Sequence, residues 1–517
     1  MRDAAMMWLS AADQWETPGL ALHLRFRSEV SVQQTDTNDL LVRHWWGAIR
    51  LSGIPPSHAD SLNQLTNEWQ DLKRLTSVAR SRLTTANEAA NLGQFLWICE
   101  QLAFLLQLRI VAKNTPLLTI QPTSREARLP VEGSRGLSHA KLSPYAFFRV
   151  ADDDLVLESA TSDHRILMHD PGIWHTVVEL GHGRRLRGTE VDGLLLEILA
   201  GTGMLAGTEP GSGVDESLIR TAEFPDLLLH KRSRFGTHDG KFGAEFPFLG
   251  ALDPPPPFPS IAEDAIALPV PDADVVRAGD PSLTEAIESR CSLREYSDES
   301  LTLTEIGEFL FRCVRVRGQY GPNPEGGMPY VAIDRPVPSG GGMHELEIYL
   351  VVGNVDQLPV GVYHYVAHRH TLELVTSSAS DVEALLQAAT RASAAPAPPP
   401  LLIKITSRFQ RVAWKYRSIG YATTLKNVGV LYQTMYLVAS AMGLAPCALG
   451  SGDEASGRQA LGPSAAGELG VGEFMLGHPI SQTLQAEVLA HRHVQPTWRS
   501  HVEPHWGRSS KGSITWS

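Results

Sequence analysis

The sequence predicts an α+β protein in which strand-rich and helix-rich blocks precede a larger C-terminal domain. Hydrophobic residues make up 43% of the 517 residues, which is enough for sizeable cores in about two to four domains. Strand patterns occur at 20–26, 40–51 and 142–159, and helical periodicity follows them. A proline run at 253–259 then separates these blocks from a half in which strands and helices alternate.

Composition excludes several classes of protein. The net charge of −12 argues against nucleic-acid binding, because phosphate contacts need a basic surface. The four cysteines form no CxxC pair, so we expect no metal site and no disulfide framework, which suits the cytoplasm. The N-terminus lacks the apolar run of a signal peptide. The most apolar helical stretch, Leu92 to Val111, contains charged and amide residues, so we expect a buried helix and no membrane segment.

The N-terminal half is expected to hold two winged-helix-like units, at 1–115 and 140–229. In the second unit, a hairpin pattern and a short strand precede two helices that start at Asp170-Pro171 and at Glu190. The second helix is acidic and carries no base-reading Arg or Asn, which disfavours DNA. The other use of such a unit is to hold a peptide along a strand edge. A purely structural role remains equally open, and residues 1–115 are expected to be a degenerate first copy.

The C-terminal half carries the chemistry. We expect a linker at 230–280 and a domain at 281–517. Its first signal is Arg290, Ser292 and Arg294, which lie on one side of an extended chain and suit a phosphate group. A turn at Pro338-Ser339-Gly340-Gly341-Gly342 follows, where glycine lets the backbone approach a ligand closely. Each motif alone is more typical of an ordinary basic turn or tight turn.

Two further features complete the pattern. Trp414-Lys415-Tyr416-Arg417 precedes a long helix from about Tyr421 to Met442 that is apolar on nearly all sides. Such a helix is buried in a core or in a subunit interface. Residues 444–453 then read as a strand and a glycine turn.

In this order, the motifs resemble the FMN-dependent nitroreductase fold, a mixed sheet flanked by helices. The closer resemblance is to the SagB-type (McbC-like) dehydrogenases, which oxidise azolines to azoles in peptide natural products. The stretches that carry it are Arg335 to Tyr349, Gly361 to Tyr365, Lys415 to Gln433 and Gly443 to Gly450. Residues 140–229 resemble the PqqD-like peptide-recognition elements.

The resemblance implies a set of site residues. Lys415 and Tyr416 would be the catalytic pair. The residues implied to hold FMN are Arg290, Ser292, Arg294, Pro338, Ser339, Gly340, Gly341, Leu449 and Gly450, with Arg492 as a further phosphate candidate. The absence of a GxGxxG fingerprint between a strand and a helix also favours FMN over FAD. Family members are homodimers with the flavin at the interface.

Azoline oxidation removes a proton and a hydride, and only a cofactor can accept the hydride. Lys415 can accept the proton if apolar surroundings and Arg417 favour its neutral form. The sequence therefore predicts an enzyme acting on a ribosomally made peptide, with leader and azoline core as partners and a possible cyclodehydratase partner. A flavin oxidase for a small or carrier-bound substrate is the alternative. The identity of the peptide, and the choice between thiazoline and oxazoline, stay open.

Overall fold

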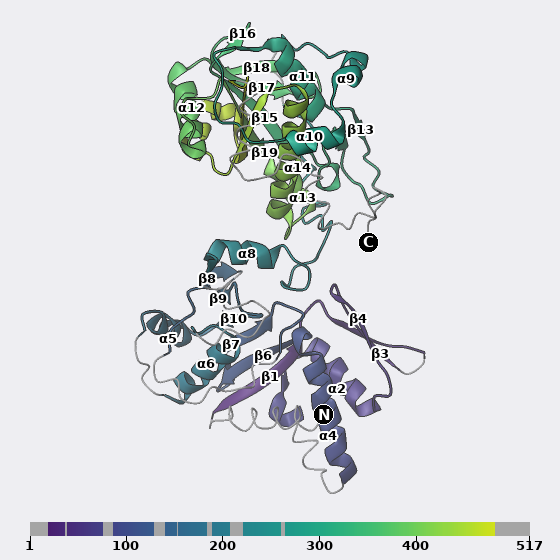
Figure 1. The fold of residues 1–517 in the computed structure, drawn as a ribbon. Helices are drawn as coiled ribbons and strands as arrows, with labels where there is room; N and C mark the ends of the chain where they lie inside the picture. Colours follow the sequence, from purple (N-terminus) through teal and green to yellow (C-terminus); the bar gives the residue numbers. More distant parts are fainter. Residues whose placement is uncertain are drawn as a thin grey trace, which may run out of the picture. The chain divides into compact units, whose positions relative to one another are not determined.

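The computed structural model describes residues 19–36, 39–75, 86–128, 140–151, 153–183, 189–206, 221–259 and 264–480. Contacts divide the chain into two compact units, Met1–Gly243 and Ala244–Ser517. Each unit contains a sheet of seven described strands with helices packed on it (Figure 1). The predicted α+β class is confirmed.

In the first unit, the described strands follow the order β5-β1-β6-β7-β10-β9-β8, and every pair is antiparallel. These strands are β1 (Leu20–Phe26), β5 (Gln70–Asp71), β6 (Leu106–Ala112), β7 (Thr115–Pro122), β8 (Ala146–Ala151), β9 (Asp154–Ser159) and β10 (His164–Met168). The helices are α2 (Pro56–Asn67), α4 (Ala86–Gln101), α5 (Pro171–Gly181), α6 (Glu190–Gly201) and α8 (Phe224–Arg232). Strands β2 (Ser31–Gln34), β3 (Leu40–His44) and β4 (Gly47–Leu51) form a separate small sheet.

The two predicted N-terminal units share this one sheet. Strand β7, from the first predicted unit, pairs with β10, from the second, with Ile120 opposite Ile166. A single hydrophobic core also runs from Leu22 to Leu205. The two segments are therefore packed as one body, and their description as two winged-helix-like units stays a prediction.

The predicted helix over Leu92 to Val111 is wrong in its second half. Helix α4 ends at Gln101, and residues 106–112 form strand β6. Leu106, Leu108 and Ile110 are buried at every second position, so they face one side of a strand. Pairing of β6 with both β1 and β7 outweighs the local helical periodicity.

In this unit, capping residues fix the starts of two helices that the sequence predicts. Asp170 caps α5 by accepting hydrogen bonds from the backbone N–H groups of Gly172 and Ile173. Thr189 and Asp192 form a reciprocal capping box at the start of α6. Both predicted helices, after Asp170-Pro171 and from Glu190, are confirmed.

In the second unit, the described strands follow the order β11-β18-β17-β15-β19-β21-β20. They are β11 (Ile266–Ala267), β15 (Leu346–Val352), β17 (Gly361–Val366), β18 (Thr371–Thr376), β19 (Leu401–Ser407), β20 (Ala445–Leu449) and β21 (Leu469–Gly477). The expectation of a mixed sheet is corrected, because every described pair within it is antiparallel. A parallel pair occurs outside it, between β12 (Leu301–Thr302) and β16 (Val355–Asp356).

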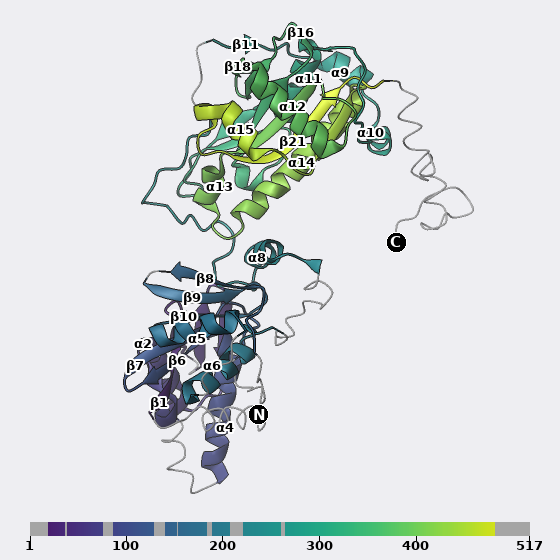
Figure 2. The same cartoon turned by 90° about the vertical axis from the view of Figure 1, so that its left-hand side faces the viewer.

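Helices cover both faces of this sheet (Figures 1 and 2). Strand β15 is buried throughout, and its alternate residues enter different cores. Ile348 and Leu350 pack with α11 (Leu303–Val314) and α14 (Gly420–Ala441), whereas Tyr349 and Val351 pack with α12 (Ala379–Ser393) and α15 (Glu454–Leu461). The remaining elements are α9 (Ala273–Gly279), α10 (Leu283–Ser289), β13 (Gly318–Tyr320), β14 (Ala332–Asp334) and α13 (Phe409–Lys415).

Part of the predicted linker is packed against α13. The buried Arg411 guanidinium donates to the carbonyl oxygens of Pro255 and Pro256, at 2.7 and 2.8 Å. The indole N–H of Trp414 donates to Leu252 O at 3.0 Å. These contacts fix the helix that ends at Lys415. The boundary in the structure falls after Gly243, and the functional limits of the domains stay a prediction.

Three observations bear on the expectations from composition. All four cysteines are buried and free. Across the described residues, no helix has the length and apolar character to cross a bilayer. Within the same residues, no cluster of His, Cys, Asp or Glu is arranged to hold a metal ion.

Candidate active site

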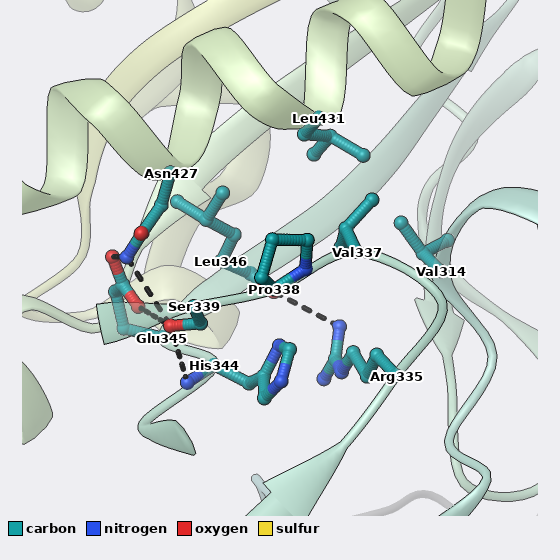
Figure 3. Close-up of a pocket in the computed structure, with 10 residues that line it drawn as sticks. All are labelled: Val314, Arg335, Val337, Pro338, Ser339, His344, Glu345, Leu346, Asn427 and Leu431. Atoms are coloured by element: carbon teal, nitrogen blue, oxygen red, sulfur yellow. Dashed lines mark hydrogen bonds between the residues drawn. The ribbon is translucent and has the colours of Figure 1, made fainter. Parts of the chain in front are cut away.

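The predicted glycine turn lies before β15 and is held by a buried polar network (Figure 3). Glu345 is fully buried, and its carboxylate accepts hydrogen bonds from Asn427 Nδ2 at 2.9 Å and Ser339 Oγ at 3.2 Å. Asn427 Oδ1 accepts from Gly340 N at 3.2 Å, and Ser339 Oγ accepts from His344 N at 3.0 Å. This network joins the turn to α14 and fixes the direction of its backbone groups.

A small cavity of about 10 Å³ lies beside this network, with room for about one water molecule. Arg335 lines it, and its buried Nε has no described hydrogen-bond partner. Burial, reinforced by the Arg335 guanidinium, lowers the pKa of His344 to about 3. His344 is therefore neutral near pH 7, and Arg335 supplies the positive charge at this wall of the turn.

The structure brings the predicted catalytic pair to the same turn. Lys415 is the last residue of α13 and is buried, with its Nζ hydrogen-bonded to the hydroxyl of Tyr330. The Nζ atom also lies 4.6 Å from the centroid of the Tyr330 ring and 5.2 Å from that of Tyr416. A Cβ atom built on Gly341 would come within 2.5 Å of the Tyr416 hydroxyl and would also meet Lys415 Nζ. Glycine is therefore required for this close approach.

Gly341 also needs its backbone freedom. Its φ of 65° lies in the left-handed region, which side chains with a Cβ rarely adopt. The local sequence thus predicts the turn correctly, and the structure gives the reason for its glycines.

The predicted phosphate-binding residues form a second group, at the other end of α14. Cys291 and Leu293 are buried, whereas Arg290, Ser292 and Arg294, which alternate with them, are partly or fully exposed. Ser292 Oγ lies 2.8 Å from the Tyr436 hydroxyl, and the Arg290 guanidinium lies 5.0 Å from the Tyr436 ring centroid. Arg294 is exposed and lines a cavity of about 390 Å³.

Leu449 and Gly450 line a separate cavity of about 450 Å³ at the ends of β20 and β21. Its floor includes a buried ion pair, Lys404 Nζ to Glu473 Oε1 at 2.9 Å. Burial raises the pKa of Glu473, and Lys404 opposes this rise. Arg492 lies outside the described residues.

Helix α14 separates the two groups of predicted site residues within one chain. Asn427, which contacts the glycine turn, and Tyr436, which contacts Ser292, are nine positions apart on this helix. At 1.5 Å per residue this is about 13 Å along the axis. One chain therefore joins Lys415 and Tyr416 to the turn, but it does not bring Arg290 and Ser292 to the same point.

Sequence reasoning missed three residues of this site: Tyr330, Glu345 and Asn427. Glu345 and Asn427 lie within the stretches that carry the family resemblance, where a carboxylate and an amide in apolar surroundings could have drawn attention. Tyr330 is 85 residues from Lys415 and carries no local signal.

Comparison with known protein families gives a match in each of the two units. Residues 287–478 match the sequence model of the nitroreductase family. These residues form a nitroreductase-family domain. Residues 140–239, in the first unit, match the model named cyanobactin oxidase ThcOx. The predicted resemblance to the SagB-type (McbC-like) dehydrogenases is confirmed, and the nitroreductase-family domain makes the chain an oxidoreductase. The PqqD-like character of residues 140–229 stays a prediction.

Three curated proteins are similar to this chain. Nitroreductase MJ1384 of Methanocaldococcus jannaschii is 29% identical over 36% of this chain and 85% of its own length. The trifolitoxin-processing protein TfxB of Rhizobium leguminosarum bv. trifolii is 32% identical over 21% of this chain and 30% of its own. The microcin B17-processing protein McbC of Escherichia coli is 30% identical over 22% of this chain and 43% of its own. The similarity thus spans less than half of TfxB and of McbC.

Solved structures also resemble this chain. One is in the E. coli microcin synthetase McbBCD complex with truncated pro-MccB17 bound, at 18% identity over 52% of this chain and 100% of that chain, with a TM-score of 0.31. Another is a nitroreductase in complex with FMN from Desulfovibrio desulfuricans, at 16% identity over 39% of this chain and 88% of that chain, with a TM-score of 0.26.

Proposed function

We propose that the chain is an FMN-dependent dehydrogenase that converts thiazolines or oxazolines to thiazoles or oxazoles in a ribosomally made peptide. The observation that carries this proposal is the contact of Lys415 and Tyr416 with the Gly341 turn in a nitroreductase-family domain. The ThcOx match and the similarity to TfxB and McbC support a peptide as the substrate.

The chemistry of the side chains fits FMN. Arg290 and Arg294 form no ion pair with a described carboxylate, so both guanidiniums are available to a phosphate. Ser292 adds a hydroxyl beside them, and the turn from Pro338 to Gly341 offers backbone to a flat ring. Arg290, Ser292 and Arg294 would hold the phosphate, and the turn with Leu449 and Gly450 would hold the ring system.

The chain's own residues would handle the proton. Lys415 would take the ring C–H proton of the azoline, and the Tyr416 hydroxyl would donate a hydrogen bond to the ring nitrogen. FMN, when bound, supplies the acceptor for the hydride. The azoline thereby loses one proton and one hydride and becomes aromatic. Repeated turnover requires a terminal two-electron acceptor, for which dioxygen is the simplest class.

A homodimer would unite the two groups of site residues. The outward side of α14 carries partly exposed apolar side chains, with Tyr421, Leu425 and Val430 each 40% exposed. A second copy packed on this helix would cover them. It could also bring its own glycine turn toward Arg290 and Ser292 of the first copy.

Residues 140–239 would hold the leader of the precursor peptide. A peptide that adds to a sheet as a further strand needs a free strand edge. In the first sheet β10 is paired on both sides, and among the described strands β8 and the two-residue β5 are at the edges. We therefore place the leader along β8, where Phe148 is 39% exposed and Val150 is 75% exposed.

The proposed substrate also implies its source. An azoline arises when a Cys, Ser or Thr side chain cyclises on the preceding amide with loss of water, so a cyclodehydratase must act first and is a possible partner. Four free cysteines suit the reducing cytoplasm in which such a peptide is made.

The test compares azoline peptides with and without their leader. We expect the purified protein to release FMN on denaturation, identified by mass spectrometry, and to oxidise the leader-bearing peptide faster. Equal oxidation rates for the two peptides would contradict leader binding by residues 140–239 and would favour the alternative of a small-molecule or carrier-bound substrate. Release of FAD would remove the cofactor assignment.

Gly341→Ala is expected to lower turnover by about 10²-fold, because the new methyl group would displace Lys415 and Tyr416 from their positions. Gly443→Ala is the matched control, since Gly443 has φ 70° but a Cβ placed there would meet no atom within 4 Å. Both changes should cost about 1–2 kcal/mol in stability from the left-handed backbone. The measurements are the turnover rate and the unfolding midpoint of each variant. Both variants carry the backbone strain, so a lower turnover rate in Gly341→Ala alone reports the lost contacts with Lys415 and Tyr416. Equal turnover rates would contradict the assignment of the active site to this turn.

A further inference from the structure

Tyr330 is a buried residue of the site to which the family resemblance gives no role. Only 5% of its surface is exposed. Its ring packs with Trp414 and Phe246, with centroids 6.4 and 6.2 Å away. This aromatic packing fixes the ring, and therefore the place of its hydroxyl.

The Tyr330 hydroxyl links the catalytic lysine to the glycine turn. Lys415 Nζ donates a hydrogen bond to the Tyr330 oxygen, and the Tyr330 O–H donates to Gly341 O at 2.7 Å. The backbone carbonyl of Lys415 is held as well, because it accepts from Glu245 N at 3.0 Å and Phe246 N at 3.1 Å. Both ends of this lysine are thus anchored.

No described carboxylate forms an ion pair with Lys415. A buried amine without an opposite charge depends on its hydrogen bonds and on aromatic faces for position. Burial raises the pKa of Tyr330, so its hydroxyl keeps its proton and continues to donate to Gly341 O. The Tyr330 oxygen is then left to accept from Lys415.

We propose that Tyr330 is a positioning residue for Lys415: it engages one N–H of the amine and leaves the lone pair free to face the substrate beside the Gly341 turn. This proposal rests on the proposed function for its catalytic meaning, but the contact itself is testable without turnover. Loss of this hydrogen bond is expected to lower the rate about tenfold.

The variant Tyr330→Phe keeps the ring and removes the hydroxyl. We expect unchanged cofactor content and KM, and a kcat reduced by about tenfold or more. Tyr363→Phe is the matched control, since the Tyr363 hydroxyl also donates to a backbone carbonyl, Pro359 O at 2.8 Å, outside this cluster.

A second readout is independent of activity. In protein labelled with ¹³Cε-lysine, the NMR chemical shift of the Lys415 signal, assigned by its loss in Lys415→Ala, should change in Tyr330→Phe, because Lys415 Nζ loses its hydrogen bond to the Tyr330 hydroxyl. Tyr363→Phe should leave it unmoved. An unchanged Lys415 signal in Tyr330→Phe would overturn the proposal. If wild-type protein fails to oxidise azolines, the proposed function is wrong, yet this NMR comparison still decides whether Tyr330 holds Lys415.

Discussion

Lys415→Ala is expected to lower the rate of azole formation by ~10² to 10⁴ while the protein keeps its cofactor. The buried amine is the basic group in contact with both Tyr330 and the Gly341 turn, so its removal leaves the ring proton without an acceptor. The measurement is kcat with an azoline peptide, together with cofactor content from the absorption spectrum.

Two further variants complete this experiment. Lys241→Ala, at an exposed lysine outside the candidate site, should retain the wild-type rate. Tyr416→Phe removes a hydroxyl and should cost less than Lys415→Ala, unless that hydroxyl is itself the proton donor. A Lys415→Ala protein with full cofactor content and wild-type kcat would show that this lysine is not the base.

Breaking the buried pair Lys404–Glu473 should have the largest effect on stability. Lys404→Met is expected to lower the free energy of unfolding by about 3–5 kcal/mol, because it leaves the Glu473 carboxylate buried without its partner. The side chains are 4% and 3% exposed and 2.9 Å apart. The double variant Lys404→Met/Glu473→Leu should recover most of the loss.

An exposed pair of the same length is the control. Arg277 and Asp274 are also 2.9 Å apart, but their side chains are 77% and 90% exposed. Arg277→Met should change stability by less than about 1 kcal/mol. The comparison uses urea unfolding of the whole chain, and a Lys404→Met protein as stable as Arg277→Met would contradict the buried-pair assignment.

Local pattern was sufficient for some elements and insufficient for others. The long helix predicted at 421–442 is α14, at Gly420–Ala441, because apolar residues recur on its face and Gly443 ends it in a left-handed conformation. By contrast, β6 was predicted as helix. Its strand state depends on β1, which lies some eighty residues earlier in the chain, and no local pattern encodes that pairing.

The candidate site also combines residues that short motifs predict with residues that only tertiary packing brings there. The turn at Pro338 to Gly341 and the Lys415-Tyr416 pair are visible as short motifs, and the structure places them together. Tyr330 belongs to the site through tertiary packing alone, against Trp414. The separation of Arg290 from the glycine turn by α14 could not be predicted either, because it depends on how the helix crosses the sheet.

The most direct test of the proposed chemistry is an anaerobic single-turnover experiment with the intact protein and one leader-bearing azoline peptide. We predict loss of the cofactor's visible absorption band, with one azole formed per reduced cofactor and a peptide lighter by two hydrogen atoms. In Lys415→Ala, cofactor and peptide should both bind while the band persists. A wild-type protein that binds FMN and the peptide but leaves the band unchanged and the azoline intact would contradict the central claim.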